Sequence, residues 1–551
     1  MASSRPIDHD HLHSLLNVSF SEEDISEYEN HTSGESESED EFINSAEDIT
    51  SVHSISSKDN EITWKYSQPT QIGRASLCNI IRQSPGITRF AANRIIDIRS
   101  SFELLFHSSI QSYIIKMTNI EGEKIFGNKW APIDEICFQA YIGLLILAGV
   151  YKSHGESTKS LWNEETGRAI FGATMSLEKF GKISRVIRFD DKSTRQERRR
   201  NDKLAPIRDV WCKWNEILPK LYYPSENITV DEQLVGFRGR CPFKQYIPTK
   251  PAKYGIKIWT LCDSKTSYAL QTQVYTGKQP GERPEKNQGM RVVNDLTQEY
   301  KGHNVYCDNF FTSYSLGQLL LKKKLTMVGT IRKNKAELPK ELKNKEIHSS
   351  EFFFTKDTTV VNYVPKKNKN VLLMSTFHHS KEISERSDKK PQIIMDYNAS
   401  KGAVDTLDQL VSTYTCKRKT NRWPMILFYN ILDVSAYNAF VLWKEVNPQW
   451  NKNKLHKRRI FIEELGKSLV LPHITSRVYQ SRNESSQNIA RRLQQSVPVT
   501  DLTIKSTAST KRSRCKFCSK SDNKTNIQCV KCTKYICKTH TTYYCPDCKE
   551  D

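Results

Sequence analysis

Hydrophobic side chains recur at three- and four-residue steps between residues 75 and 225, and this spacing predicts helices. One such stripe consists of Phe102, Leu105, Phe106, Ile110, Tyr113, Ile114 and Met117. The apolar run from Ile136 to Val150 is about fifteen residues long, too short to cross a bilayer, and predicts a buried helix. We therefore expect a helical segment here and no membrane partner.

The period changes at residue 228, where short runs rich in β-branched and aromatic residues begin. ITVDEQLVGF, GIKIWTLCDS and YALQTQVYTG, separated by turn residues, predict three strands. There follow a helix over 288–300, a strand in HNVYCDNFF, a helix over Ser315–Lys323 and a strand in LTMVGTIRKN. Sequential strands followed by alternating helices and strands predict an α/β core over residues 226–334.

Residues 335–392 interrupt this pattern. They are irregular and rich in lysine, with one expected strand pair in EFFFTK and TVVNYV, and we interpret them as an insertion domain. In residues 393–414, QIIMDYN then predicts a strand and KGAVDTLDQLVSTYT a helix. A second long helix should begin near Pro424 within a helical segment of residues 415–479, because proline is favoured in the first turn of a helix.

The two ends of this pattern differ in charge and composition from its centre. Residues 1–70 alternate serine with acidic residues and have few large apolar side chains, which predicts a disordered acidic tail. Residues 480–510 are polar and without a period, so we interpret them as a linker. The formal net charge is +21, and residues 1–60 carry −13, which leaves +34 on the remainder. A basic body of this size indicates a nucleic-acid partner.

Residues 511–551 contain cysteine and histidine pairs with the spacing of metal ligands. These pairs are Cys515 with Cys518, Cys529 with Cys532, Cys537 with His540, and Cys545 with Cys548. Zn²⁺ prefers four tetrahedral sulfur or nitrogen ligands, so the four pairs predict two structural zinc ions. The alternative is a disulfide framework, but the other seven cysteines are scattered singly and no signal peptide is recognised, which favours a reducing compartment.

The pairs can be grouped in two ways. Interleaving, as in the cross-brace of RING and PHD modules, gives the tetrads Cys515/Cys518/Cys537/His540 and Cys529/Cys532/Cys545/Cys548, and we favour this grouping. Sequential grouping gives a Cys₄ site followed by a Cys₃His site. A RING ubiquitin ligase is a further interpretation, which the short spacing between His540 and Cys545 disfavours.

Two aspartates stand in apolar, strand-like runs. Asp231 follows Ile228-Thr-Val and Asp308 follows Val305-Tyr-Cys, and burial of a carboxylate is costly unless a cation or hydrogen bonds compensate. Asp405, which shares a helix face with Asp408, would complete an oxygen cage suited to Mg²⁺ and to phosphodiester displacement. For each aspartate taken alone, a strand-end or helix-capping role is the favoured interpretation.

A basic turn, KRKTNRWP, lies between the last two expected helices. It offers Lys417, Arg418, Lys419 and Arg422 for phosphate contacts beside Trp423, which could stack on bases. The alternative is a solvated turn with a core tryptophan.

Long motifs of this chain resemble the piggyBac transposases. They are ITVDEQLVGFRGRCPFKQYIPTKPAKYGIKI, CDNFFTS, YNASKGAVDTLDQ and TCKRKTNRWP, together with the order of the terminal Cys/His pairs. The resemblance extends from about residue 80 to the end. It implies a multidomain α/β protein with an RNase H-like catalytic core, an insertion domain, flanking helical DNA-binding and dimerisation segments, and a C-terminal cross-brace zinc module.

The resemblance also implies an activity. Asp231, Asp308 and Asp405 would form the catalytic triad with two Mg²⁺ ions, Asp408 would be a further acid near the metal site, and Asp396 would not be required. The chain would excise double-stranded DNA at terminal inverted repeats through hairpin ends and insert it at TTAA sites.

The resemblance further implies a homodimer in the nucleus. DNA contacts from the terminal module would come from Lys511, Arg512, Arg514 and Lys516. The competing hypothesis is a domesticated, catalytically silent relative that binds DNA as a regulator.

Overall fold

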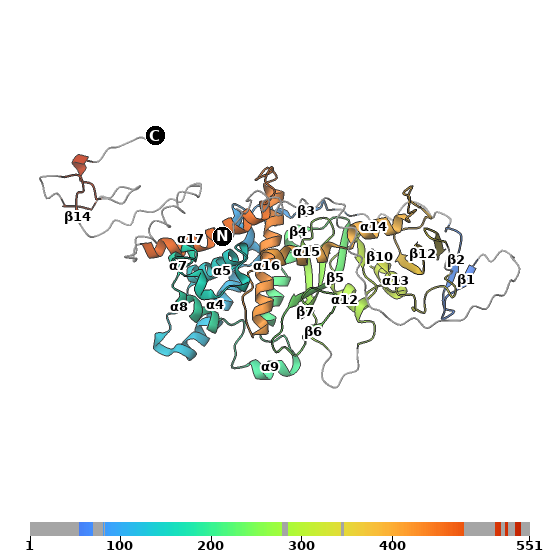
Figure 1. Cartoon of the computed structure of the whole chain (residues 1–551), viewed down its shortest axis with the longest axis horizontal. Helices are drawn as coiled ribbons and strands as arrows, with labels where there is room; N and C mark the ends of the chain where they lie inside the picture. The colour runs from blue at the N-terminus through green and yellow to red at the C-terminus, as the bar shows by residue number, and fades with distance from the viewer. Residues whose placement is uncertain are drawn as a thin grey trace, which may run out of the picture. The chain divides into compact units, whose positions relative to one another are not determined.

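The computed structural model describes residues 54–69, 81, 83–277, 285–342, 346–478, 513–518, 524–526 and 535–540 (Figure 1). They belong to two compact units, Met1–Arg491 and Arg492–Asp551, and each is described by itself. The predictions for the acidic tail before residue 54 and for the linker 480–510 lie outside the described residues.

An eleven-stranded mixed sheet forms one side of the first unit (Figure 1). Its strands lie in the order β1, β2, β11, β12, β13, β10, β9, β5, β7 and β6, and β8 pairs with β7. Their bounds are β1 Ser54–Ser56, β2 Thr63–Lys65, β5 Asn227–Gly236, β6 Gln245–Tyr246, β7 Tyr254–Asp263, β8 Ala269–Val274, β9 Asn304–Cys307, β10 Thr326–Thr330, β11 Ser350–Phe354, β12 Thr359–Lys366 and β13 Lys369–Ser375.

The five strands predicted for residues 226–334 are neighbours in one half of this sheet. β7 pairs antiparallel with both β8 and β5, whereas β5 pairs parallel with β9, and β9 pairs parallel with β10. Parallel neighbours need a crossover connection, which α13 (Tyr314–Lys322) supplies between β9 and β10. The predicted helix before β9 is α12 (Gln288–Leu296). The predicted α/β order of these elements is confirmed.

Residues 335–392 extend this sheet by three antiparallel strands. β13 pairs with β10, β12 with β13, and β11 with β12, so the segment interpreted as an insertion shares a sheet with the core. The sequence predicts β11 and β12 but not β13, because the continuous apolar run from Val371 to Met374 has no strand period. Phe352, Val361 and Leu373 from these strands pack in one buried cluster with Tyr306 and Val328.

The prediction of disorder up to residue 70 is wrong for residues 54–69. Strands β1 and β2 pair as an antiparallel hairpin, and Lys65 pairs with Phe354 at the edge of β11. Trp64 is fully buried, and its indole nitrogen donates a 3.0 Å hydrogen bond to the carbonyl of Glu337. A single large aromatic anchor thus fixes a segment whose average composition is that of a disordered chain.

The prediction of a strand in QIIMDYN is also wrong. Residues Gln392–Ser400 form the helix α14, which follows Pro391. Ile393, Ile394 and Tyr397 are its buried face, and they pack against the aromatic cluster of the sheet. Such a short apolar run fits a helix or a strand equally well, so tertiary packing decided its conformation.

Helices flank the sheet in the first unit (Figure 1). Those of the segment 75–225 are α2 Arg89–Ala92, α3 Ile98–Leu105, α4 Ser108–Phe126, α5 Glu135–Val150, α6 Thr158–Leu161, α7 Ala169–Thr174, α8 Leu177–Val186, α9 Arg195–Asn201, α10 Arg208–Asn215 and α11 Leu218–Leu221. A short ladder of β3 (Gly86–Ile87) and β4 (Tyr222–Tyr223) joins the two ends of this segment. The later helices are α15 Ala403–Thr413, α16 Trp423–Val446 and α17 Lys457–Val478.

The predicted buried helix is α5, in which every residue from Cys137 to Val150 is buried. It packs along α17 at a pair of glycines. A Cβ on Gly143 would lie 2.7 Å from Cγ1 of Val470 and 2.9 Å from the carbonyl oxygen of Gly466. The two backbones can approach this closely only because neither glycine carries a side chain.

The long helix α16 begins as predicted, with Pro424 in its first turn. By length and composition it could cross a membrane, but 89% of its most apolar window is buried in the protein, which is typical of a core helix. It contacts both β5 and α3, so it lies between the sheet and the helical segment (Figure 1).

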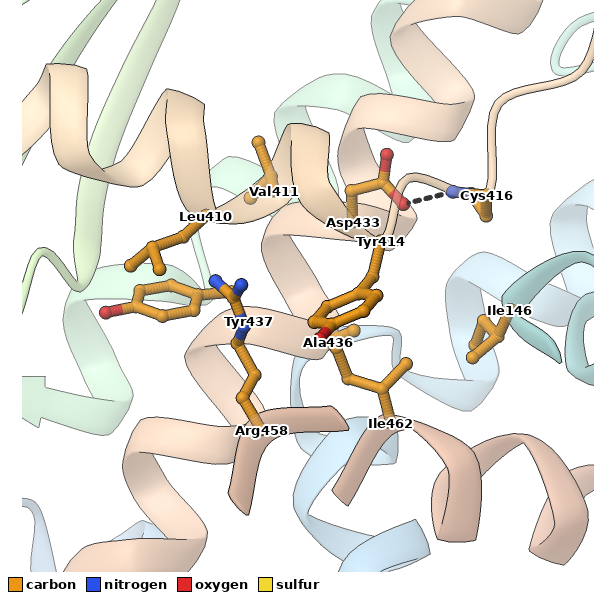
Figure 2. Close-up of a pocket in the computed structure, with 10 residues that line it drawn as sticks. All are labelled: Ile146, Leu410, Val411, Tyr414, Cys416, Asp433, Ala436, Tyr437, Arg458 and Ile462. Atoms are coloured by element: carbon orange, nitrogen blue, oxygen red, sulfur yellow. Dashed lines mark hydrogen bonds between the residues drawn. The ribbon is translucent and has the colours of Figure 1, made fainter. Parts of the chain in front are cut away.

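A buried carboxyl group, that of Asp433 on α16, lies where four helices meet. The surrounding side chains come from α5, α15, α16, α17 and the turn after α15 (Figure 2). Asp433 accepts a 2.8 Å hydrogen bond from the amide of Cys416 and a 2.6 Å bond from the hydroxyl of Thr415. Burial nevertheless raises the pKa of Asp433 to about 7.

This raised pKa predicts a pH-dependent stability. An unfolded aspartate titrates near pH 3.9, so between about pH 4 and 7 the folded protein binds a proton that the unfolded chain releases. The contribution of the protonated Asp433 to folding stability is complete below about pH 4 and is lost as the pH rises to 7. Asp433→Asn cannot ionise at this position. The free energy of unfolding of the variant minus that of the wild type should therefore be roughly 2–3 kcal/mol greater at pH 8 than at pH 5.

Urea unfolding of both proteins, followed by tryptophan fluorescence at pH 5 and pH 8, measures this difference. Equal differences at the two pH values would contradict the assignment of a proton to Asp433.

Candidate active site and metal-binding clusters

The parallel pairing of β5 with β9 brings Asp231 and Asp308 together. The register joins Val230 to Cys307, so each aspartate is the residue that follows the last paired position of this ladder. The side chain of Glu232 joins them. Each of the three side chains offers one carboxylate oxygen, and these oxygens all lie within 4.8 Å of one another.

These carboxylates share a poorly solvated site. Burial, and then the charges of Asp308 and Glu232, raise the pKa of Asp231 well above its ordinary value. Burial and the charge of Glu232 likewise raise the pKa of Asp308 to about 6, although the amides of Phe310 and Phe311 oppose the shift. Crowded carboxylates of this kind favour protonation or a bound cation.

Asp405 lies at the start of α15, and this helix packs against β5. Its carboxylate is engaged by Lys250 in a 2.7 Å ion pair, and it does not belong to the Asp231 cluster. Burial would lower the pKa of Lys250, but the negative charges of Asp231 and Asp405 outweigh burial and raise it. The lysine therefore links the third predicted acid electrostatically to the first.

Asp408, one turn further along α15, faces the same strand. It accepts a 3.1 Å hydrogen bond from Nε2 of Gln233, and Oε1 of Gln233 accepts a 3.2 Å bond from Asn430 on α16. Burial raises the pKa of Asp408 even though the bond from Gln233 favours its charged form. In contrast, Asp396 on α14 binds Nε2 of His378 at 2.8 Å and is not part of the cluster.

Sequence reasoning missed Glu232, Gln233 and Lys250. Successive residues of a strand point to opposite faces, so Glu232 is expected to point away from Asp231. Lys250 lies in the turn between β6 and β7, and no sequence pattern places that turn beside α15. All three residues stand in the motif ITVDEQLVGFRGRCPFKQYIPTKPAKYGIKI, which is the signal that could have found them.

The basic turn is largely occupied with contacts inside the protein. Lys417 donates to the carbonyl of Gly236, and Arg418 donates to the carbonyls of Ser153 and Glu156. Lys419 is exposed and remains available for a ligand.

The last two residues of this turn, Arg422 and Trp423, are also held by the fold. Arg422 donates to the carbonyls of Ser184, Arg185 and Ile187. Trp423 is only 7% exposed and packs edge-on against Phe243, with ring centroids 5.0 Å apart. The prediction that Trp423 stacks on bases is therefore disfavoured, and the core alternative describes it better.

The second unit brings Cys515, Cys518, Cys537 and His540 together, which is the grouping that interleaved pairing requires. Nδ1 of His540 lies 3.8 Å from Sγ of Cys515, 3.6 Å from Sγ of Cys518 and 3.2 Å from Sγ of Cys537. The sulfurs of Cys518 and Cys537 are 3.7 Å apart. A tetrahedral zinc site has S···S edges of about 3.8 Å and S···N edges of about 3.5 Å, so the cluster has the size of such a site.

The surroundings of Cys515 and Cys537 lower the pKa values of their thiols. Burial alone would raise the pKa of Cys537, but hydrogen bonds with Thr539 and Cys518 outweigh it and lower the pKa to about 7. The thiolate is the form that binds metals. The predicted ligands Cys529, Cys532, Cys545 and Cys548 and the basic residues Lys511 and Arg512 lie outside the described residues, whereas Arg514 and Lys516 are exposed.

Comparisons with known proteins agree with these features. A family model described as Transposase IS4 matches residues 99–440, more than half of the chain. Human PiggyBac transposable element-derived protein 3 is 25% identical over 337 residues, which cover 56% of this chain and 55% of that protein. Human PiggyBac transposable element-derived protein 2 is 24% identical over 371 residues, which cover 62% of this chain and 60% of that protein. The chain thus spans little more than half the length of these curated relatives.

A solved structure resembles the chain over a greater length. The cryo-EM structure of a piggyBac transposase synaptic complex with hairpin DNA superimposes with a TM-score of 0.70 at 35% identity, covering 85% of this chain and 100% of that one. The family match spans both acids of the parallel ladder and the helix that carries Asp405 and Asp408. From these matches we conclude that the chain belongs to the piggyBac transposase family.

Proposed function

We propose that this chain is a piggyBac-type DNA transposase that cuts double-stranded DNA at terminal inverted repeats, passes through hairpin ends and inserts at TTAA. The observation that carries the proposal is the convergence of Asp231, Glu232 and Asp308 at the end of the parallel ladder. Asp405 and Asp408 lie on the adjoining helix. The related structure is a transposase complex with hairpin DNA, which supports the same substrate class here.

The strand order supports an RNase H-like catalytic core. In order along the chain, the central strands are β5, β7, β8, β9 and β10, and in space they lie as β8, β7, β5, β9 and β10. A three-strand antiparallel meander is thereby joined to two parallel strands at β5. The first two acids fall on the two strands at this junction, where ligands commonly bind in α/β sheets.

The acidic site suits Mg²⁺. Its oxygens converge within 4.8 Å, and their mutual repulsion is the strain that a divalent cation relieves. Asp231, Glu232 and Asp308 would hold Mg²⁺, and Asp405 on the adjoining helix would complete the ligand set for two ions. When bound, the ions would activate the attacking oxygen and stabilise the leaving oxygen of a phosphodiester.

Other residues of the chain position these acids. Lys250 holds the Asp405 carboxylate and offsets part of the local negative charge. Gln233, itself held by Asn430, fixes the orientation of Asp408. Thr229 donates a 2.7 Å hydrogen bond to the carbonyl of Ser400 and so ties the strand of Asp231 to the segment that leads into α15.

We further propose that residues 511–551 bind two zinc ions as a cross-brace and contact terminal-repeat DNA through Lys511, Arg512, Arg514 and Lys516. The Cys₃His cluster supports the first of these ions. We also propose that the protein acts as a homodimer in the nucleus.

A domesticated DNA-binding regulator is the second candidate. The curated relatives are named as transposable element-derived proteins and are about one quarter identical to this chain. A wild-type protein that binds terminal-repeat duplex and never cuts it would favour the regulator.

Loss of one carboxylate charge should abolish cutting without loss of folding. Asp231→Asn, Asp308→Asn and Asp405→Asn preserve side-chain shape, so each should lower Mg²⁺-dependent nicking of a terminal-repeat duplex by more than about a hundredfold. Asp408→Asn should lower the same nicking activity by about ten- to a hundredfold, because Asp408 lies beside the metal site.

Asp396→Asn is the matched control, since this acid pairs with His378 outside the cluster. Near-normal nicking by any triad variant would mean that the acid is wrongly assigned.

Zinc content tests the terminal module separately. Purified full-length protein should contain about two zinc ions per chain, and Cys518→Ser should lose about one of them. Cys212→Ser, at a free cysteine of α10, is the control and should retain both. Elemental analysis that finds no zinc, or mass spectrometry that finds disulfides among Cys515 to Cys548, would contradict the assignment.

A further inference from the structure

A hollow lined by arginines lies between α9 and the start of α16. Its volume is about 190 Å³, several times the share of about 30 Å³ that one water occupies in the liquid. Four arginines line it: Arg188, Arg195, Arg199 and Arg422. Phe189, Pro206, Asn421, Trp423 and Pro424 complete the wall, which contains no carboxylate.

Two of these arginines are held in place from behind. Arg195 donates a 2.9 Å hydrogen bond through Nε to the buried carboxylate of Asp190, which also binds Arg198. Arg188 pairs with Glu121 at 2.6 Å, yet its own Nε is buried without a hydrogen-bond partner. The guanidinium groups of Arg195 and Arg188 are therefore held in place by the carboxylates of Asp190 and Glu121, which do not line the hollow.

The other two arginines form no ion pair with an acidic side chain of the described residues. Arg422 binds only backbone carbonyls among the described residues. Burial, and then the charge of Arg188, lower its pKa to about 10. The side chain of Arg199 is exposed and makes no ion pair or hydrogen bond with the part of the chain that the structure describes.

We infer that this hollow binds a backbone phosphate of duplex DNA, an inference that rests on the proposed function. Guanidinium groups match the geometry of phosphate oxygens, and charge-assisted bonds to a phosphate would offset the repulsion among the arginines. The contact is sequence-independent and positions the duplex. It gives a role in substrate binding to Arg188, Arg195 and Arg199, which no sequence motif marks.

Charge reversal at Arg199 tests the site with a neighbouring control. Arg200 follows it on α9, is equally exposed, and does not line the hollow. Without Mg²⁺, Arg199→Glu should bind terminal-repeat duplex roughly tenfold more weakly than Arg200→Glu. The slope of log affinity against log salt concentration should be shallower by about one unit for Arg199→Glu than for Arg200→Glu. Arg199→Gln should lose affinity in the same direction, and thermal unfolding checks that all variants fold.

A neutral methylphosphonate, introduced at one duplex position at a time, identifies the bound phosphate. At that position it should weaken wild-type and Arg200→Glu binding but leave Arg199→Glu unaffected. Equal losses for Arg199→Glu and Arg200→Glu, with normal wild-type binding and nicking, would overturn the inference alone.

A titration with inorganic phosphate distinguishes a site for free phosphate from a site for a DNA phosphate. Stabilisation of the wild type by phosphate that is lost in Arg199→Glu, without any difference in DNA binding, would overturn the assignment to DNA. Failure of the wild type to bind duplex at all would overturn both this inference and the proposed function.

Discussion

The parallel pairing of β5 with β9 is the constraint on which the site depends. Two strands that lie far apart in sequence share one register, and each continues directly into an aspartate. A shift of one residue would turn one carboxylate to the other face of the sheet. The packing of α15 on β5 brings the later acids, Asp405 and Asp408, to the same region.

Charges of like sign gather at two places in the first unit, negative at one and positive at the other. Lys257 and Lys250 offset part of the negative charge through ion pairs with Glu232 and Asp405. The acid cluster gathers carboxylates whose repulsion and burial raise their pKa values. The hollow beside α9 gathers guanidinium groups, with Arg422 lacking an acidic partner among the described residues. Both arrangements cost folding energy in the isolated protein. A bound cation would compensate the first, and a bound phosphate would compensate the second.

The sheet is continuous across segments that the chain order separates. Residues 54–65, 335–392 and the central strands contribute to one set of ladders, anchored by Trp64 at one edge. The core and the insertion are therefore separate segments along the sequence, but in the structure they share one sheet. Side chains from both segments and from α14 pack in one hydrophobic cluster. A substitution in this cluster should shift the neighbouring strands that carry the acids, because closely packed side chains transmit strain.

The sequence by itself determined the elements with a long or regular period and the ligands with a fixed spacing. The central strands, the buried helix α5, the start of α16 at Pro424 and the cysteine pairs follow from local chemistry, and the family motifs mark Asp231, Asp308, Asp405 and Asp408. Only the tertiary structure decided α14, β13 and the Trp64 hairpin, because short apolar runs take the conformation that their neighbours impose. It alone also brought Glu232, Lys250 and the arginines of the hollow to their partners, since contacts across the fold leave no periodic signal along the chain.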